Sequence, residues 1–158
     1  MNFAEAYPIP SETASVSDMP IGRAYAPQAS DGQTVADLPL HSTLQSIRRL
    51  SSYGNDWDGH GSPAPRAESV QSSLEAIRVF HRSIVTSGHR WAQPHVSANE
   101  DGNVVFEWWQ GEKKLTIYIR AANVTFIKVW GMNIDTEMED GRVTNSGFSP
   151  LWTWLSEA

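Results

Sequence analysis

A chain of 158 residues with 40% hydrophobic and 10% aromatic side chains has the size and apolar content of one globular domain. It contains no cysteine, which excludes disulfides, thiolate metal sites and cysteine nucleophiles. Its 12 basic residues are dispersed among 18 acidic ones, for a net charge of -6, so direct binding to nucleic acid is not expected.

The N-terminal segment, residues 1–36, is predicted to be a disordered arm, because it is rich in Ser, Ala, Pro, Asp and Gly and has neither helical nor strand periodicity. The chain begins without basic residues or an apolar run of signal-peptide length. No later segment approaches the ~18 apolar residues of a membrane span. These features predict a cytoplasmic protein with no membrane partner, in which residues 37–158 form a single α+β domain.

Two amphipathic helices are predicted at the start of this domain. The first is expected to begin with Ser42 or Thr43 as its N-cap and to end near Gly54. The second runs from about residue 66 to residue 87 and ends at Gly88. The apolar side chains that recur at helical spacing are Leu40, Leu44, Ile47 and Leu50 in the first helix, and Val70, Leu74, Ile77, Phe80 and Ile84 in the second.

Four antiparallel strands in a meander are predicted between Pro94 and Trp130, where β-branched and aromatic residues alternate with turn formers. Pairing Trp108 with Leu115 places six large apolar side chains on one face of this sheet. They are Val104, Phe106, Trp108, Leu115, Ile117 and Ile119. Val124 and Phe126 of the last strand are expected to join them, and the helices to pack on this face.

An acidic segment and a terminal helix complete the predicted fold. Residues 131–147 are polar, and their Asp140-Gly141 pair is suited to a turn between two short edge strands. Residues 148–155 are predicted to be helical, with Ser149 as the N-cap and Pro150 at the first position. The predicted fold class is therefore α+β, with a four-stranded antiparallel meander sheet, helices packed on one face, a C-terminal helix and a disordered N-terminal arm.

The second face of the predicted sheet carries Val105, Glu107, Trp109, Thr116 and Tyr118, with Ile127 and Val129 from the last strand. This face is too apolar to be a bare surface. Coverage by the terminal helix, through Trp152 and Trp154, is the favoured interpretation, and an open binding face is the alternative. Glu107 is interpreted as a strand residue paired with Lys114 or Lys128, and not as a general acid.

The loop from residue 55 to residue 65 holds Asp56, Asp58 and His60, which are suitable ligands for a divalent metal or an acid/base pair. The favoured interpretation is structural: both carboxylates accept backbone N–H bonds, Gly59 and Gly61 adopt positive φ, and Trp57 packs into the core. The sequence has none of the usual motifs for phosphate, dinucleotide, zinc or acyl chemistry. We therefore predict no catalytic residue and no cofactor.

The loop also carries a resemblance. Asp56-Trp57-Asp58-Gly59-His60-Gly61-Ser62-Pro63-Ala64-Pro65, a following helix and Phe106-Glu107-Trp108 are similar to a family of small uncharacterised bacterial and prophage proteins, with an N-W-D-G-Y-G-(A/S)-x-P loop and a later L-E-W strand. The chain departs from that pattern at Asp56, where Asn is usual, and at His60, where Tyr is usual. The resemblance spans about half of the chain and implies an antitoxin, immunity or anti-defence role associated with mobile elements.

The leading hypothesis is a non-enzymatic interaction protein that binds another protein and inhibits or regulates it. The predicted contacts, besides the N-terminal arm, are Trp109, Tyr118, Glu107, Asp135, Glu137, Glu139 and Asp140. A metal-dependent hydrolase that uses Asp56, Asp58 and His60 is one alternative, and a small-ligand binding module on the second sheet face is another. A homo-oligomer also stays open.

Overall fold

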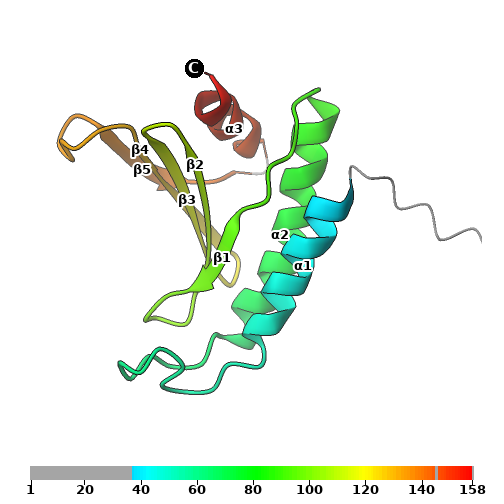
Figure 1. The fold of residues 1–158 in the computed structure, drawn as a ribbon, viewed down its shortest axis with the longest axis vertical. Coiled ribbons are helices and arrows are strands. Elements are labelled where there is room, and N and C mark those ends of the chain that lie inside the picture. The colour runs from blue at the N-terminus through cyan, green and yellow to red at the C-terminus, as the bar shows by residue number, and fades with distance from the viewer. Residues whose placement is uncertain (1–36, 145, 158) are drawn as a thin grey trace, which may run out of the picture. The chain divides into compact units, whose positions relative to one another are not determined.

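The computed structural model describes residues 37–144 and 146–157, which all belong to one compact unit, Gln33–Ala158. The predicted N-terminal arm, residues 1–36, lies outside the described residues. Within these described residues, three helices and five strands follow one another (Figure 1). They are α1 (Leu38–Leu50), α2 (Ala67–Thr86), β1 (His95–Ala98), β2 (Val104–Gln110), β3 (Lys113–Arg120), β4 (Asn123–Val129), β5 (Met138–Arg142) and α3 (Phe148–Ser156).

The strands form one antiparallel meander in the order β1-β2-β3-β4-β5. The predicted register is confirmed, since Trp108 lies opposite Leu115, and Val124 lies opposite Ile119. The α+β class is confirmed as well. The apolar periodicity of these strands was sufficient to fix the register because a slip of one residue would turn every core side chain toward the other face.

The number of strands differs from the prediction, because β5 adds a fifth strand at the edge beside β4. This strand contains Asp140 and Gly141, so the turn predicted at these residues is wrong. The chain reverses earlier, where Asn133 O accepts the Glu137 N–H at 2.6 Å. Glycine suits position 141 because a Cβ there would lie 2.9 Å from Cε1 of Phe126 on the neighbouring strand.

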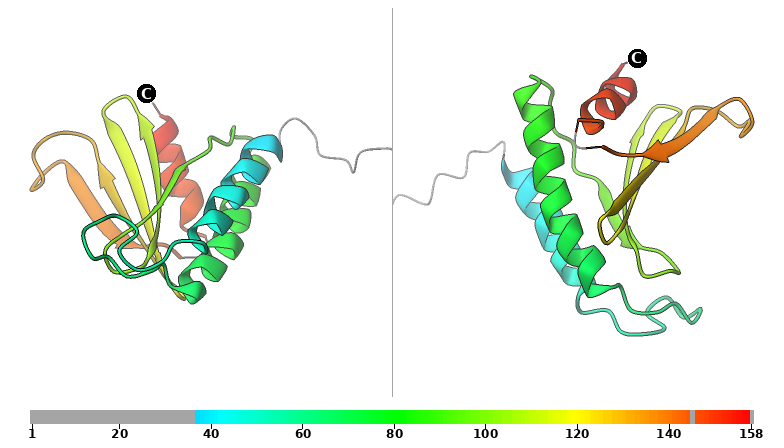
Figure 2. Two further views of the ribbon diagram at one scale, coloured as in Figure 1. Left: turned by 60° about the horizontal axis from the view of Figure 1, so that its bottom comes forward. Right: turned by 180° about the vertical axis from the view of Figure 1, so that it is seen from behind.

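All three helices lie on the same side of the sheet (Figures 1 and 2), as the sequence predicts. The core between these layers contains Ile47 of α1, Ile77 and Phe80 of α2, and Trp152 of α3, packed against strand residues of one parity. Those strand residues are Val104, Phe106, Trp108, Leu115, Ile117 and Ile119. None of the helices in the described part of the chain is long and apolar enough to cross a membrane.

The predicted start and end of α1 are both wrong. The helix begins at Leu38, with Pro39 in its first turn, where a fixed φ and a missing N–H are tolerated. Neither Ser42 nor Thr43 is the N-cap, and Thr43 Oγ1 instead donates to the carbonyl of Pro39 at 2.8 Å. The helix ends at Leu50, before Gly54, because backbone hydrogen bonds from the next residues reach back only three positions.

The two later helices agree with the prediction in extent but not in every cap. Helix α2 lies within one residue of the predicted bounds at each end, and Gly88 follows it with a φ of 78°. Helix α3 begins at Phe148, yet its N-cap is Gly147 and not Ser149. The Ser149 hydroxyl contacts Ser87 Oγ at 3.3 Å, so it does not satisfy a backbone N–H of its own helix.

Candidate functional site

The terminal helix packs on the core face, so the prediction that it covers the second face is wrong. The Trp152 ring lies 5.7 Å from that of Trp108 and stacks on Trp91 at 5.5 Å. Trp154 lies 6.0 Å from Trp130 and beneath the ammonium of Lys128, whose strand partner Leu115 belongs to the core. Helix α3 goes to this side because the aromatic cluster offers it several ring surfaces to bury at once.

We call the other side of the sheet the open face, because no helix among the described residues packs on it (Figures 1 and 2). Strand register assigns its members, since directly paired residues of an antiparallel sheet share a face. They are His95 and Ser97 of β1, Val105, Glu107 and Trp109 of β2, Lys114, Thr116, Tyr118 and Arg120 of β3, Asn123, Thr125, Ile127 and Val129 of β4, and Met138, Asp140 and Arg142 of β5.

The centre of the open face is closely packed although none of the described helices lies over it. Val105 is 6% exposed, yet it is outside the cluster of core residues between sheet and helices. Thr116 is also buried, and Tyr118, which pairs with Val105, is half-buried. Neighbouring side chains of the sheet therefore cover one another and form a continuous surface.

One end of the open face presents Trp109, which is 55% exposed and directly follows the buried Trp108. The ammonium of Lys114 lies 5.2 Å from the centroid of the Trp109 ring and 2.5 Å from Glu107 Oε1. His95 Nδ1 approaches the other oxygen of Glu107 at 3.4 Å. The predicted pairing of Glu107 with Lys114 is thus present, and the cation–π contact restricts the orientation of the Trp109 ring.

The four acidic residues predicted as contacts do not share one surface. Asp140 lies on the open face opposite Ile127, whereas Glu139 lies on the other side and binds Lys128 Nζ at 2.6 Å. Glu137 accepts a backbone N–H within the turn at 2.8 Å, and Asp135 lies in the same turn. Their proximity in sequence is lost because side chains alternate between the two faces of a strand.

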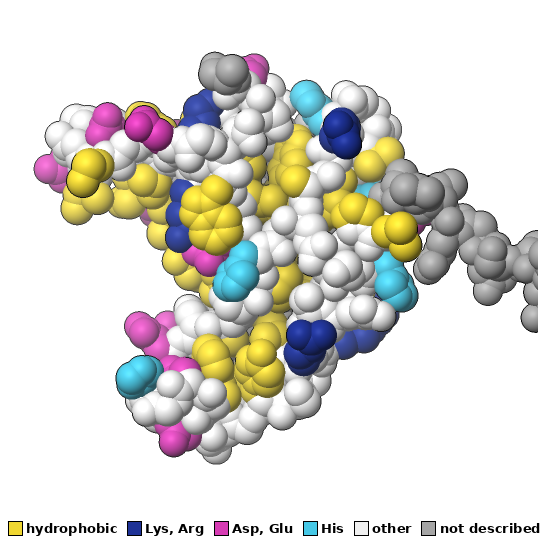
Figure 3. Space-filling view, in the orientation of Figure 1, with side chains coloured by type: hydrophobic (Ala, Val, Ile, Leu, Met, Phe, Trp, Pro, Cys, Tyr) yellow, Lys and Arg dark blue, Asp and Glu magenta, His cyan; other side chains and the backbone are white. Residues whose placement is uncertain are grey.

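Sequence reasoning missed the apolar tip of the β4–β5 hairpin. Met132 is 100% exposed and Ile134 is 69% exposed. Figure 3 shows hydrophobic and acidic side chains close together on this hairpin, at the upper left. Isolated apolar residues in a polar segment gave a weak signal, because their exposure depends on the position of the turn.

The loop before α2 uses its carboxylates to hold its own backbone. Asp58 Oδ1 accepts the His60 N–H at 2.9 Å, and Asp58 Oδ2 accepts the Ser62 hydroxyl at 2.5 Å. Asp56 Oδ1 accepts the Gly61 N–H at 2.7 Å. Within residues 37–144 and 146–157, no group of three or more histidine and acidic side chains is arranged to hold a metal ion. The geometry therefore assigns these carboxylates to backbone hydrogen bonds.

The glycines and the tryptophan of this loop have structural positions. Gly59 and Gly61 have backbone φ values of 72° and 82°, which residues with a Cβ rarely adopt. The Trp57 ring stacks on Tyr53 at 5.5 Å and packs against the core, and its Nε1–H donates to Pro63 O at 3.2 Å. The loop is thereby fixed to the end of α1.

Hydrogen bonds from the Ser62 hydroxyl, and next from the His60 N–H, lower the pKa of the Asp58 carboxyl below its ordinary value. Because the pKa is lower in the folded state, the stabilisation is present above the unfolded pKa of about 3.9 and is lost as the pH falls through the folded pKa. We expect Asp58→Asn to lower the free energy of unfolding at about pH 7, and this deficit to shrink towards about pH 3. Urea unfolding at several pH values measures it.

The control for this prediction is Glu100→Gln, which removes an exposed carboxylate that makes no hydrogen bond or ion pair among the described residues. Its effect on the free energy of unfolding is expected to be small at every pH. A deficit for Asp58→Asn that stays constant across the range would contradict the role assigned to the charged carboxylate.

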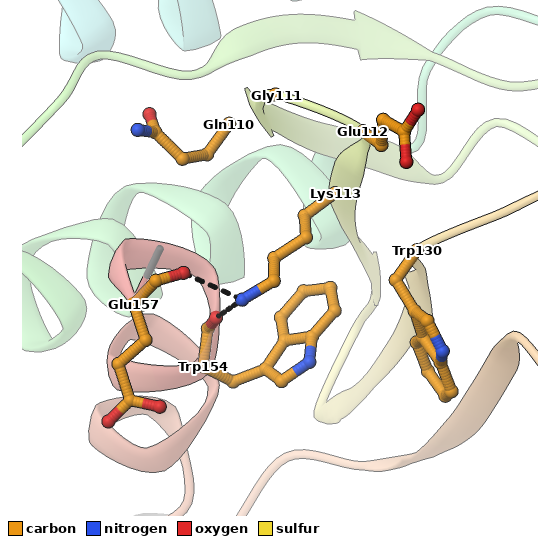
Figure 4. Close-up of a pocket in the computed structure, with 7 residues that line it drawn as sticks. All are labelled: Gln110, Gly111, Glu112, Lys113, Trp130, Trp154 and Glu157. Carbon is orange, nitrogen blue, oxygen red and sulfur yellow. Dashed lines mark hydrogen bonds between the residues drawn. The ribbon is translucent and has the colours of Figure 1, made fainter.

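A cleft of about 540 Å³ lies beside the C-terminal end of α3, with Trp130, Trp154 and Lys113 in its lining (Figure 4). Lys113 Nζ donates to the carbonyls of Trp154 at 2.8 Å and Glu157 at 2.7 Å. These bonds satisfy carbonyls at the end of a helix, where a cation is also favoured by the helix dipole. The ammonium in this cleft therefore anchors α3 to β3.

Comparisons with protein-family models, with curated proteins and with solved structures find no match for this chain. The resemblance of the loop at residues 56–65 to a family of small bacterial and prophage proteins stays a prediction. The open face is therefore the feature of the molecule from which a function can be inferred.

Proposed function

We propose that this protein is a non-enzymatic interaction protein, which binds another protein through the open face and inhibits or regulates it. The resemblance of the loop implies that such an inhibitor would be of the antitoxin, immunity or anti-defence type. The observation that supports the proposal best is Trp109, more than half exposed at one end of a sheet face that no described helix covers.

Trp109 has the properties of a binding anchor. Tryptophan is enriched among the residues that contribute most to protein–protein affinity, and a restricted ring loses little conformational entropy on binding. Lys114 holds the ring from one side, and Glu107 holds Lys114. Val105 and Thr116 are almost fully buried, so the contact area beside this anchor comes from the more exposed side chains around them. The apolar tip at Met132 and Ile134 extends the candidate contact area.

The two alternatives have weaker support. A hydrolase at Asp56, Asp58 and His60 would require carboxylate oxygens that already accept hydrogen bonds from the loop. A small-ligand module has a cleft of suitable volume beside Trp154, but the ammonium there is bound to helix carbonyls. The absence of an enzymatic activity and of a cofactor stays a prediction.

Affinity capture from lysate of the native host, with quantitative mass spectrometry, tests the proposal. We expect a stoichiometric partner protein to be captured by the unchanged chain. Trp109→Ala should weaken its binding by about thirtyfold or more, since truncating an anchor residue costs about 2 kcal/mol or more.

The matched control is Val85→Ala, which truncates an apolar side chain of similar exposure on α2, away from the open face. This variant should capture the partner as well as the unchanged chain does. Equal capture by Trp109→Ala, or no stoichiometric partner in any sample, would contradict the proposal.

A further inference from the structure

A polar cavity of about 370 Å³ lies at the end of the open face opposite to Trp109. The turn between β1 and β2 forms part of its wall, and strands β3, β4 and β5 form the rest. Every side chain in its lining carries a polar group. The lining residues that could contact a ligand are Asp101, Asn103, Tyr118, Arg120, Asn123 and Arg142.

Two arginines of this cavity have no acidic partner among the described residues. Arg120 lies opposite Asn123 in the strand register, Arg142 Nη2 donates to Asn123 Oδ1 at 3.2 Å, and both arginines line the cavity. Neither arginine forms an ion pair with any of the described residues. Two like charges that converge on one cavity would be stabilised by a bound oxyanion, which a guanidinium can hold with two hydrogen bonds.

The chain has 18 acidic residues and only 12 basic ones, yet none of the described arginines forms an ion pair with a described residue. Arg120 and Arg142 differ from the other arginines because both line the same polar cavity. Two lysines of the same sheet do form ion pairs, since Lys114 binds Glu107 and Lys128 binds Glu139. Ion pairs are thus formed where strand register brings opposite charges together. At the end of the open face that holds Arg120 and Arg142, no acidic residue lies opposite the arginines in the strand register, so their positive charges are available to a ligand.

The cavity also contains acceptors without a donor. The carboxylate of Asp101 makes no hydrogen bond or ion pair among the described residues. Asn103 is 8% exposed, and its Oδ1 has no donor in this part of the chain. Rotation about χ2, which is a soft torsion in asparagine, can turn this oxygen toward a donor in the cavity. A ligand that fits both sets of groups carries an anionic group and a donor next to each other.

We propose that this cavity binds a carboxylate with a neighbouring N–H group, as found at the C-terminus of a peptide or protein chain. Arg120 and Arg142 bind the carboxylate, and the Tyr118 hydroxyl adds a donor. Asp101 and Asn103 accept the N–H. A phosphate dianion fits less well, because the Asp101 carboxylate repels a double negative charge more strongly. The inference rests on the proposed function only in making the partner protein the carrier of this chain end.

Nuclear magnetic resonance titration of the full-length, ¹⁵N-labelled chain tests the inference without the partner. The probes are N-acetyl-glycylglycine with a free carboxylate, its C-terminal amide, acetate and inorganic phosphate. We expect saturable shifts at Tyr118, Asn123 and Arg142 with the free peptide, and binding weaker by about tenfold or more for each other probe. Arg120→Gln and Arg142→Gln should each weaken peptide binding by about tenfold or more.

Two controls separate this inference from the proposed function. Arg49→Gln removes an exposed arginine of α1, and Trp109→Ala removes the anchor at the other end of the open face; neither should change peptide binding. The inference would be overturned if the C-terminal amide bound as tightly as the free peptide, or if phosphate bound more tightly than it. It would also be overturned if both arginine variants bound the peptide as the unchanged chain does, or if the peptide caused no saturable shift. If the peptide binds, but Trp109→Ala captures the partner as well as the unchanged chain does, only the proposed function is contradicted.

Discussion

Trp108→Ala is expected to lower the free energy of unfolding by about 3–5 kcal/mol, the range found when a large aromatic side chain is removed from a core. Trp108 is 3% exposed, and its ring lies within about 6 Å of those of Trp91, Phe148 and Trp152. Its Nε1–H also donates to the carbonyl of Ala92 at 2.8 Å, so the truncation leaves a buried acceptor without its donor. Urea unfolding followed by circular dichroism measures the change.

The neighbouring residue provides the control, because Trp109 points to the opposite face of the same strand and is 55% exposed. Trp109→Ala is expected to lower the free energy of unfolding by at most about 1 kcal/mol, through loss of its contact with Lys114. Similar losses for the two variants would mean that the two faces of the sheet do not differ in burial as described.

Phe148→Ala is expected to have a comparable effect, about 3–5 kcal/mol, by weakening the attachment of α3. The Phe148 ring is buried and stacks on Phe80 of α2, with centroids 3.9 Å apart and planes inclined by 8°. It also contacts Trp108 and Trp152. Hydrogen exchange should show that the amides of α3 lose more protection than those of α1.

Ser149→Ala is the matched variant for this helix. A serine that caps a helix contributes about 1 kcal/mol, but Ser149 lies inside α3 and makes no capping bond. The expected change in the free energy of unfolding is therefore within about 0.5 kcal/mol. A loss as large as that of a true N-cap would favour the sequence-based assignment over the structure.

The register of the central strands could be predicted from the sequence, whereas the fifth strand could not. Phe106, Trp108, Leu115 and Ile117 alternate with less apolar residues, and only one pairing puts them all on one side. Strand β5 has the sequence Met-Glu-Asp-Gly-Arg, which has little strand propensity. It is extended because β4 offers it hydrogen bonds, and that is a tertiary effect which local sequence does not encode.

The candidate site was only partly predictable for a similar reason. Alternation placed Glu107, Trp109 and Tyr118 on a common face, and the structure shows that they share it. The side of the sheet on which α3 packs depends on where Trp152 can bury more aromatic surface, and here that is against Trp91 and Trp108. The spacing of apolar residues in the sequence does not indicate this choice. The arginine cavity was missed entirely, because Arg142 reaches it only through the unpredicted β5.

Methyl cross-saturation in a complex with the captured partner tests most directly whether the open face is the contact surface. The saturated partner transfers its magnetisation only to methyl groups that it touches. We predict attenuation at Ile127 and Val129 on the open face, and none at Val79 and Val85, which are exposed on α2. Attenuation at Val79 and Val85, with Ile127 and Val129 unaffected, would contradict the proposed role of the open face.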